Sequence, residues 1–125
     1  MNDFINEGDK VTPKILLSKT NNQFYFKGTS RPENPKEFYS GVFSWFTNYF
    51  ENPNDKTVVQ VQLDYFNTST SKVLLDLFEF FEEKVNDSFN IKVVWQYKTD
   101  DEEMMEAGEE LLDLVDIPYE IQEVA

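Results

Sequence analysis

The 125-residue chain is 40% apolar and 16% aromatic, so it can bury one hydrophobic core but not two. Its 24 acids against 11 bases give a net charge of −13, which makes nucleic acid and membrane surfaces poor partners because both are negatively charged. Histidine and cysteine are absent, which excludes His-based catalysis, Cys and Ser–His nucleophiles, disulfides and zinc-type metal sites.

The first twelve residues, MNDFINEGDKVT, are mostly polar and acidic. We expect residues 1–12 to form a flexible end, with Phe4 and Ile5 as the side chains able to dock, and residues 13–125 to form a single domain. The N-terminus does not resemble a signal peptide, and no apolar stretch reaches transmembrane length. Together with the absence of cysteine, this favours a cytoplasmic location.

Two short apolar runs come next, KILLS at 14–18 and QFYFKG at 23–28. The polar KTNN between them predicts a β-hairpin. The segment TSRPENP (29–35) is predicted to be a loop, since two prolines three residues apart interrupt regular structure. Aromatic and apolar residues at helical spacing then predict a helix over 36–50, with its aromatic stripe in the core, and NPND (52–55) ends it.

The rest of the chain alternates strands and helices. Its patterns predict strands at 57–65, 90–97 and 117–124, and amphipathic helices at 73–85 and 100–115. The resulting order, β-β-α-β-α-β-α-β, predicts a single α/β domain with a mixed, mainly parallel sheet that is covered by helices.

In an open α/β sheet, functional groups gather where the parallel strands end. Three connections, TSRPENP (29–35), FNTSTS (66–71) and KTDDEE (98–103), leave the predicted parallel strands at their carboxyl ends. We therefore expect these three segments to meet at one edge of the sheet and to hold the functional residues.

Four hydroxyl residues in a row, Thr68, Ser69, Thr70 and Ser71, precede the second helix. One interpretation is structural: Thr68 or Ser69 caps the helix by accepting a backbone N–H. The other is functional, because a phosphate on one of these hydroxyls meets the free N–H groups and the positive dipole end of the helix. Lys72, one turn further on, is placed to assist.

The acidic residues after the strand 90–97 also allow two interpretations. Asp100 and Asp101, at the start of the third helix, either complement its dipole or bind a hard cation such as magnesium. A magnesium-dependent enzyme that uses Asp64, Asp100 and Asp101 is therefore an alternative function. It lacks a nucleophile paired with a base and a nucleotide-binding loop.

The loop TSRPENP supplies three further candidates. Arg31 is the only arginine of the chain. It is either a solvated surface residue or a residue that binds a carboxylate or phosphate through two parallel hydrogen bonds. Glu33 and Asn34 are candidates to cap the first helix.

Three segments together resemble the SiaC family of bacterial biofilm-regulation phosphoproteins: GTSRPENPKEFY (28–39), YFNTSTSK (65–72) and VVWQYKTDDEEMMEAGEEL (93–111). The resemblance runs from about residue 22 to residue 122. It implies a STAS-like fold, similar to anti-sigma-factor antagonists, and a regulatory switch that is not an enzyme and needs no cofactor or metal. The phosphorylated threonine of the family falls in its NTS motif, which places it at Thr68 here.

The resemblance also implies three protein partners. These are a kinase with a histidine-kinase-like ATPase domain, a PP2C-type phosphatase, and an output enzyme, expected to be a diguanylate cyclase that the unphosphorylated form activates to raise cyclic di-GMP. It gives no support to a role for Arg31.

Around the expected phosphate, we expect Asn67 and Ser69 to shape the loop, and Asp64 and Lys72 to orient phosphoryl transfer. Ser69 is the alternative phosphate acceptor, because the hydroxyl run continues past Thr68. A STAS-like interaction scaffold that is never phosphorylated is the remaining alternative.

Overall fold

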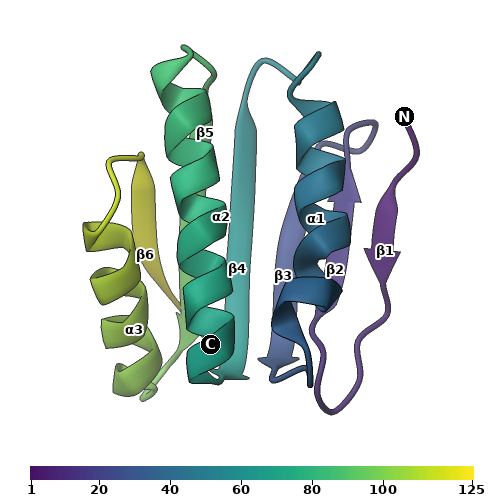
Figure 1. Ribbon diagram of the computed structural model, residues 1–125. Helices are drawn as coiled ribbons and strands as arrows, with labels where there is room; N and C mark the ends of the chain where they lie inside the picture. The colour runs from purple at the N-terminus through teal and green to yellow at the C-terminus, as the bar shows by residue number, and fades with distance from the viewer.

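The strands of the sheet lie in the same order as they occur in the chain (Figure 1). The computed structural model describes residues 1–125, and its strands are β1 (Phe4–Asn6), β2 (Lys14–Ser18), β3 (Gln23–Ser30), β4 (Thr57–Phe66), β5 (Ile91–Lys98) and β6 (Tyr119–Val124). The pairs β1–β2 and β2–β3 are antiparallel, and β3 to β6 are parallel. The predicted mixed, mainly parallel sheet is confirmed.

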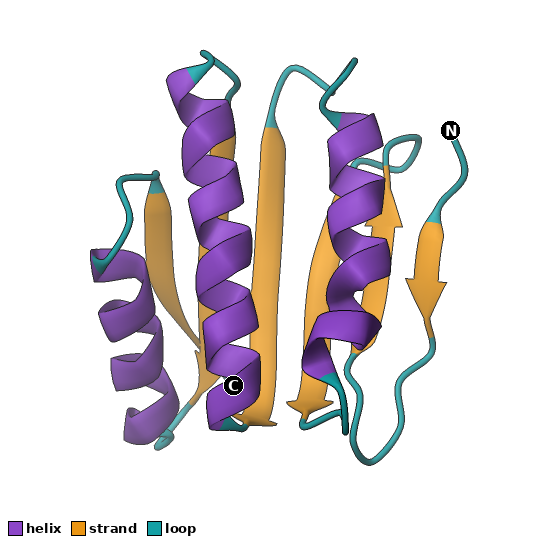
Figure 2. Ribbon diagram, viewed as in Figure 1, coloured by secondary structure: helices purple, strands orange, loops and turns teal.

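Three helices cover one face of this sheet: α1 (Pro35–Tyr49), α2 (Thr68–Asn86) and α3 (Glu102–Asp113) (Figure 2). Right-handed crossovers that always step to the next strand in the same direction place every helix on the same side. The opposite face carries residues such as Gln60, Lys92 and Gln122, which keep part or most of their surface in solvent. None of the three helices combines the length and the apolar character needed to span a bilayer.

The aromatic stripe of α1 lies in the core, as predicted. Trp45, Phe46 and Tyr49 are at most 8% exposed, and the rings of Trp45 and Tyr49 stack with 5.1 Å between centroids. Phe24 of β3 packs against the same cluster. This aromatic layer fixes α1 against the antiparallel half of the sheet.

The N-terminal residues, expected to be a flexible end, contain the edge strand β1. Phe4 packs against Gly41 of α1, where a Cβ would stand 2.8 Å from the Phe4 ring. The Trp45 indole donates a hydrogen bond to the Asn2 carbonyl at 2.8 Å. The structure places the strand Phe4–Asn6 within the segment for which the sequence predicted no regular structure, because the Phe4 ring and the Asn2 carbonyl find partners on α1.

The predicted loop 29–35 is also shorter than expected, because β3 continues to Ser30. A bulge in β4 allows this: Gly28 pairs with Leu63, but Thr29 pairs with Tyr65, which leaves Asp64 as the extra residue. The shift pairs Ser30 with Phe66 and turns Phe66 toward the helices, where its ring lies 5.9 Å from that of Trp95. The bulge therefore sets the residue from which α2 starts.

Candidate functional site

The connections that follow β3, β4 and β5 meet at one edge of the sheet, as expected from the parallel topology (Figure 1). The ends of β3 and β4 are joined directly, because the Asn67 N–H donates to the Ser30 carbonyl at 3.2 Å. The first turns of α1 and α2 therefore start close together, and the hydroxyl run, residues 68–71, forms the first turn of α2.

The cap of α2 is Asn67, and not Thr68 or Ser69. The Asn67 side chain accepts the Thr70 N–H at 2.9 Å, so Thr68 is the first residue inside the helix. Asparagine caps at least as well as threonine or serine, and the bulge in β4 leaves Asn67 at the turn. Because the cap is supplied by Asn67, the hydroxyls of Thr68 and Ser69 are not needed for capping, and both residues are exposed.

A buried polar network lies beneath this turn. The Thr70 hydroxyl is fully buried and lies 3.1 Å from both the hydroxyl and the carbonyl oxygen of Ser30. The Ser30 hydroxyl also lies 2.6 Å from the Tyr39 hydroxyl of α1. Burial raises the pKa of Tyr39 to about 12, against the opposing effect of its hydrogen bond with Ser30. The network ties β3, α1 and α2 together directly below the hydroxyl run.

The four hydroxyls thus have different environments. Thr70 belongs to the buried network, and the Ser71 hydroxyl donates to the Thr68 carbonyl at 2.7 Å. Thr68 and Ser69 are left as the two exposed hydroxyls of the run.

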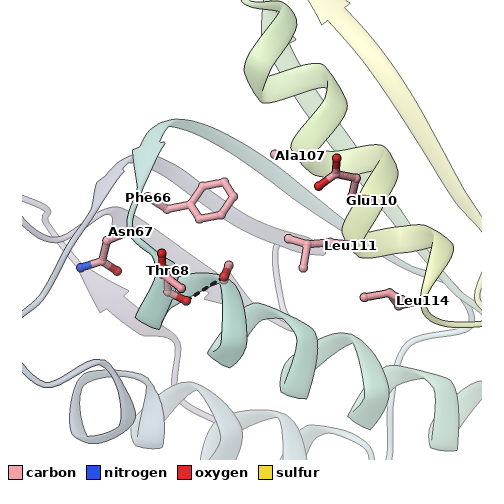
Figure 3. Close-up of a pocket in the computed structure, with 8 residues that line it drawn as sticks. Phe66, Asn67, Thr68, Ala107, Glu110, Leu111 and Leu114 are labelled. Atoms are coloured by element: carbon pink, nitrogen blue, oxygen red, sulfur yellow. Dashed lines mark hydrogen bonds between the residues drawn. The ribbon is translucent and has the colours of Figure 1, made fainter.

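Thr68 lines a groove between α2 and α3, which we call the α2/α3 groove (Figure 3). Its volume is about 330 Å³. In Figure 3, Leu111 of α3 and Phe66, just before α2, extend into the space between the two helices. The full lining is Phe66, Asn67, Thr68, Ser71, Ala107, Glu110, Leu111 and Leu114.

Ser69 lines a different depression, between the first turns of α1 and α2, which we call the α1/α2 cleft. Its volume is about 240 Å³, and its lining is Asn34, Pro35, Lys36, Ser69, Lys72, Val73 and Asp76. Lys72, expected beside a phosphate on Thr68, therefore lies with Ser69 in this cleft. Two neighbouring hydroxyls border two depressions of different chemistry.

The aspartates of the alternative enzyme do not gather into a ligand set. Asp64 forms an ion pair with Lys98 at 2.8 Å, and this hydrogen bond is the main reason why the pKa of Lys98 is raised. Asp101 caps α3 by accepting the Met104 N–H at 3.1 Å, while Asp100 is exposed with a φ of 74°. No three carboxylates of the chain lie close enough together to hold a metal ion.

The loop before α1 holds the remaining candidates. Asn34 caps α1 as predicted, since its side chain accepts the Glu37 N–H at 3.2 Å and donates to the Glu37 carboxylate at 3.2 Å. Glu33 and Arg31 are exposed, and Arg31 is held through its backbone, whose N–H donates to the Val11 carbonyl at 2.8 Å.

Several residues of the site had no sequence signal that singled them out. Ser30 and Tyr39 are ordinary residues of a strand and a helix until the fold brings them to Thr70. Leu111 and Leu114 are three residues apart in the acidic helix, and this spacing was the available hint of an apolar stripe beside Thr68.

Comparisons with known proteins match nearly the whole chain. The model of the SiaC family of regulatory phosphoproteins matches residues 6–124. An uncharacterized protein of Pseudomonas aeruginosa strain UCBPP-PA14 is 26% identical over 122 residues, which are 98% of this chain and 97% of that protein.

Solved structures agree with this match. SiaC of Pseudomonas aeruginosa is similar with a TM-score of 0.88 and 25% identity, over 99% of this chain and all of that one. The crystal structure of the diguanylate cyclase SiaD in complex with its activator SiaC, from the same organism, matches with a TM-score of 0.91 and 25% identity, over 98% of this chain and 100% of the matched chain.

Proposed function

Because the chain belongs to the SiaC family of regulatory phosphoproteins, we propose that it is a partner switch whose phosphate is carried by Thr68. The observation that carries the proposal is the position of Thr68, exposed in the first turn of α2 and on the wall of the α2/α3 groove. The chain is a regulatory protein, on which a kinase and a phosphatase would act.

The start of α2 suits a phosphate in two ways. The N–H groups of the first helical residues have no partner within the helix, and the dipole of the helix is positive at this end. The Asn67 side chain occupies the Thr70 N–H, which leaves the N–H groups of Thr68 and Ser69 for phosphate oxygens. A kinase also needs an accessible hydroxyl, which Thr68 provides and Thr70 does not. Ser69 is exposed too and stays the alternative acceptor.

A phosphate on Thr68 adds about −1.5 to −2 charges to the wall of a partly apolar groove. The facing helix contributes Glu110, Leu111 and Leu114 to the same groove. A partner that packs there against the unphosphorylated protein would have to desolvate the phosphate, and it therefore binds the phosphorylated form more weakly.

The proposed partners are proteins. A structure of SiaD with its activator SiaC is among those most similar to this chain, so we propose a diguanylate cyclase as the output enzyme. The reversible switch further needs a kinase, proposed to have a histidine-kinase-like ATPase domain, and a PP2C-type phosphatase. We place all of them in the cytoplasm, and we keep the likeness to STAS domains as part of the proposal.

Intact-mass spectrometry after incubation with the cognate kinase and ATP tests the assignment. We expect one added phosphate on the natural protein and on Ser69→Ala, and none on Thr68→Ala, because Thr68 is the proposed acceptor. Asn67→Ala is a useful third variant, since it loosens the helix start without removing a hydroxyl.

A phosphate that persists in Thr68→Ala and disappears in Ser69→Ala would move the switch to the α1/α2 cleft. Absence of any modification in the natural protein, with a kinase shown to be active, would instead favour an interaction scaffold that is never phosphorylated.

A further inference from the structure

We propose that the α2/α3 groove is the docking surface for the output enzyme, and that its occupant is an amphipathic helix of that enzyme with leucine-sized apolar side chains flanked by lysines or arginines. This inference rests on the proposed function and adds to it the docking surface and the chemistry of the partner segment.

The groove has an apolar floor that is open to solvent. Leu114 is 67% exposed, more than any other large apolar residue of the chain, and it adjoins Leu111 and Ala107 along one side of α3. Phe66 closes the groove from the side of the sheet. The other exposed large apolar residues, such as Ile5 and Tyr65, do not line the groove. Apolar side chains that are gathered in a depression mark an interaction site more strongly than scattered ones do.

The groove offers a small polar ligand no buried polar group that lacks a partner. Such ligands are recognised by polar groups that converge from within a pocket, whereas every buried side-chain nitrogen and oxygen of this protein already has a hydrogen-bond partner. Apart from Phe66 at the end of β4, the groove is lined by α2, α3 and the residues that cap them, and it offers no free strand edge. A partner helix, which presents side chains at helical spacing, fits such a groove, and an extended strand does not.

The rim of the groove determines the charge of the partner. The sequence of α3, EEMMEAGEELLD, holds six acids and no base, and of these Glu110 lines the groove itself. A groove with an apolar floor and Glu110 in its wall, on a helix that carries five further acids, favours a partner segment with apolar anchors and basic flanks. A second copy of this chain is a poor occupant, since each copy carries a net charge of −13 and would present the same acidic helix.

The groove is formed before any partner arrives. The Trp95 indole donates to the Met104 carbonyl at 2.9 Å, and its ring fills the space where Gly108 would carry a Cβ. At the other end, the Asp116 N–H donates to the Glu82 carboxylate of α2 at 2.6 Å. These contacts hold α3 at a set distance from the sheet and from α2, so binding does not have to order the groove.

The binding of the purified cognate diguanylate cyclase to the full-length, unphosphorylated protein tests this inference by isothermal titration calorimetry. Leu114→Asp removes an exposed anchor and adds a charge to the floor, and we expect an affinity at least about 30-fold lower. Ile5→Asp is the matched control, because Ile5 is 58% exposed on β1. We expect its affinity to stay within about twofold of that of the natural protein. Circular dichroism verifies that both variants are folded.

Two further readouts address the chemistry of the occupant. The affinity should fall as salt rises, and Glu110→Gln should make it fall less steeply. Hydrogen exchange of the cyclase should show protection in a helical segment with apolar residues at helical spacing and lysines or arginines beside them. Protection in an acidic segment or in a strand would overturn the inference.

The failure of this inference is distinguishable from that of the proposed function. If Leu114→Asp binds like the natural protein while phosphorylation at Thr68 still weakens binding, the groove is not the docking surface and the switch stands. If phosphorylation at Thr68 leaves the affinity unchanged, the proposed switch fails. If Leu114→Asp abolishes self-association of the chain and leaves cyclase binding intact, the occupant is a second copy and the inference is wrong.

Discussion

The α2/α3 groove and the α1/α2 cleft lie on either side of the first turn of α2, and they differ in almost every chemical respect. The groove is lined by Phe66, Leu111 and Leu114, with Glu110 as its single charged residue, whereas the cleft is lined by Lys36, Lys72 and one aspartate. Thr68 borders the first and Ser69 the second, because successive helical residues point about 100° apart. A shift of the phosphate by one residue would therefore change which surface it alters.

If Thr68 carries the proposed phosphate, this difference explains how a small, very acidic protein would use one more negative charge as a signal. Next to Lys36 and Lys72, a phosphate would be partly neutralised where it stands. In the groove the phosphate would lie beside Glu110 and apolar side chains. Any partner that docks there would have to desolvate the phosphate, and this weakens its binding. The same modification is expected to change partner binding little on the cleft side of α2 and to weaken it strongly on the groove side.

The largest effect is expected from Gly108→Ala, which should move α3 and so alter the groove but not the cleft. In Gly108→Ala the new Cβ would overlap the Trp95 indole, so α3 has to shift away from the sheet. We expect a loss of about 3 kcal/mol of unfolding free energy and weaker cyclase binding, with the α1/α2 cleft unchanged. Urea denaturation and calorimetric titration measure the two effects. Ala107→Gly, one residue earlier on the same helix, controls for helix propensity; an equal loss there would contradict the packing argument.

Removal of the buried hydroxyl beneath both depressions should have the next largest effect. In Thr70→Val the Ser30 hydroxyl and carbonyl lose a buried partner, while the volume of the side chain is kept. A buried group left without its partner costs about 1–3 kcal/mol, and we expect about 2 kcal/mol. Ser71→Ala loses an outer hydrogen bond with the Thr68 carbonyl and should lose much less. Equal denaturation midpoints for the two variants would argue against the buried network as the anchor of α2.

A negative charge placed on each side of α2 tests the comparison itself. Thr68→Glu puts a carboxylate on the wall of the groove, and we expect about tenfold weaker cyclase binding, which corresponds to about 1.4 kcal/mol. Ser69→Glu puts the same charge beside Lys36 and Lys72 and should leave the affinity nearly unchanged. The reverse ranking in the same titration would place the docking surface at the cleft.

The smallest expected effect is confined to alkaline pH and belongs to the cleft side, where Tyr39 joins α1 to Ser30. The pKa of Tyr39 is raised to about 12 in the folded protein, from 10.0. Between these values the unfolded chain releases its proton first, so stability falls as pH rises, by about 1.4 kcal/mol per pH unit at most. Denaturation experiments at about pH 9 and near pH 10.7 measure this effect. Between these pH values the natural protein should lose about 1 kcal/mol more unfolding free energy than Tyr39→Phe does. Parallel trends would show that Tyr39 ionises as freely when folded as when unfolded.

The fold could be read from the sequence to a large extent because its signals are local. Periodic apolar residues marked all three helices and the five longer strands, and alternation of strands with helices implied parallel pairing. The strand β1 and the end of β3 were missed for another reason. Both depend on contacts made far along the chain, Phe4 on Gly41 and Thr29 on a bulged β4.

For the candidate site, the sequence predicted that the three connections share one edge of the sheet and that the hydroxyl run starts a helix, but not the environment of each hydroxyl. Thr70 is buried because Ser30, 40 residues earlier, lies beneath it. Thr68 lies beside Leu111 and Leu114 because α3 is held in place by Trp95, whose indole donates to the Met104 carbonyl. Such neighbours are set by tertiary packing, and no spacing within the run NTSTS encodes them.

The affinity of the cognate cyclase for one sample of the protein, measured before and after its phosphorylation by the kinase, tests the switch most directly. We expect at least about tenfold weaker binding after one phosphate is added, full recovery after phosphatase treatment, and no change in Thr68→Ala carried through the same steps. An affinity that is equal before and after phosphorylation, or that falls as much in Thr68→Ala, would contradict the account.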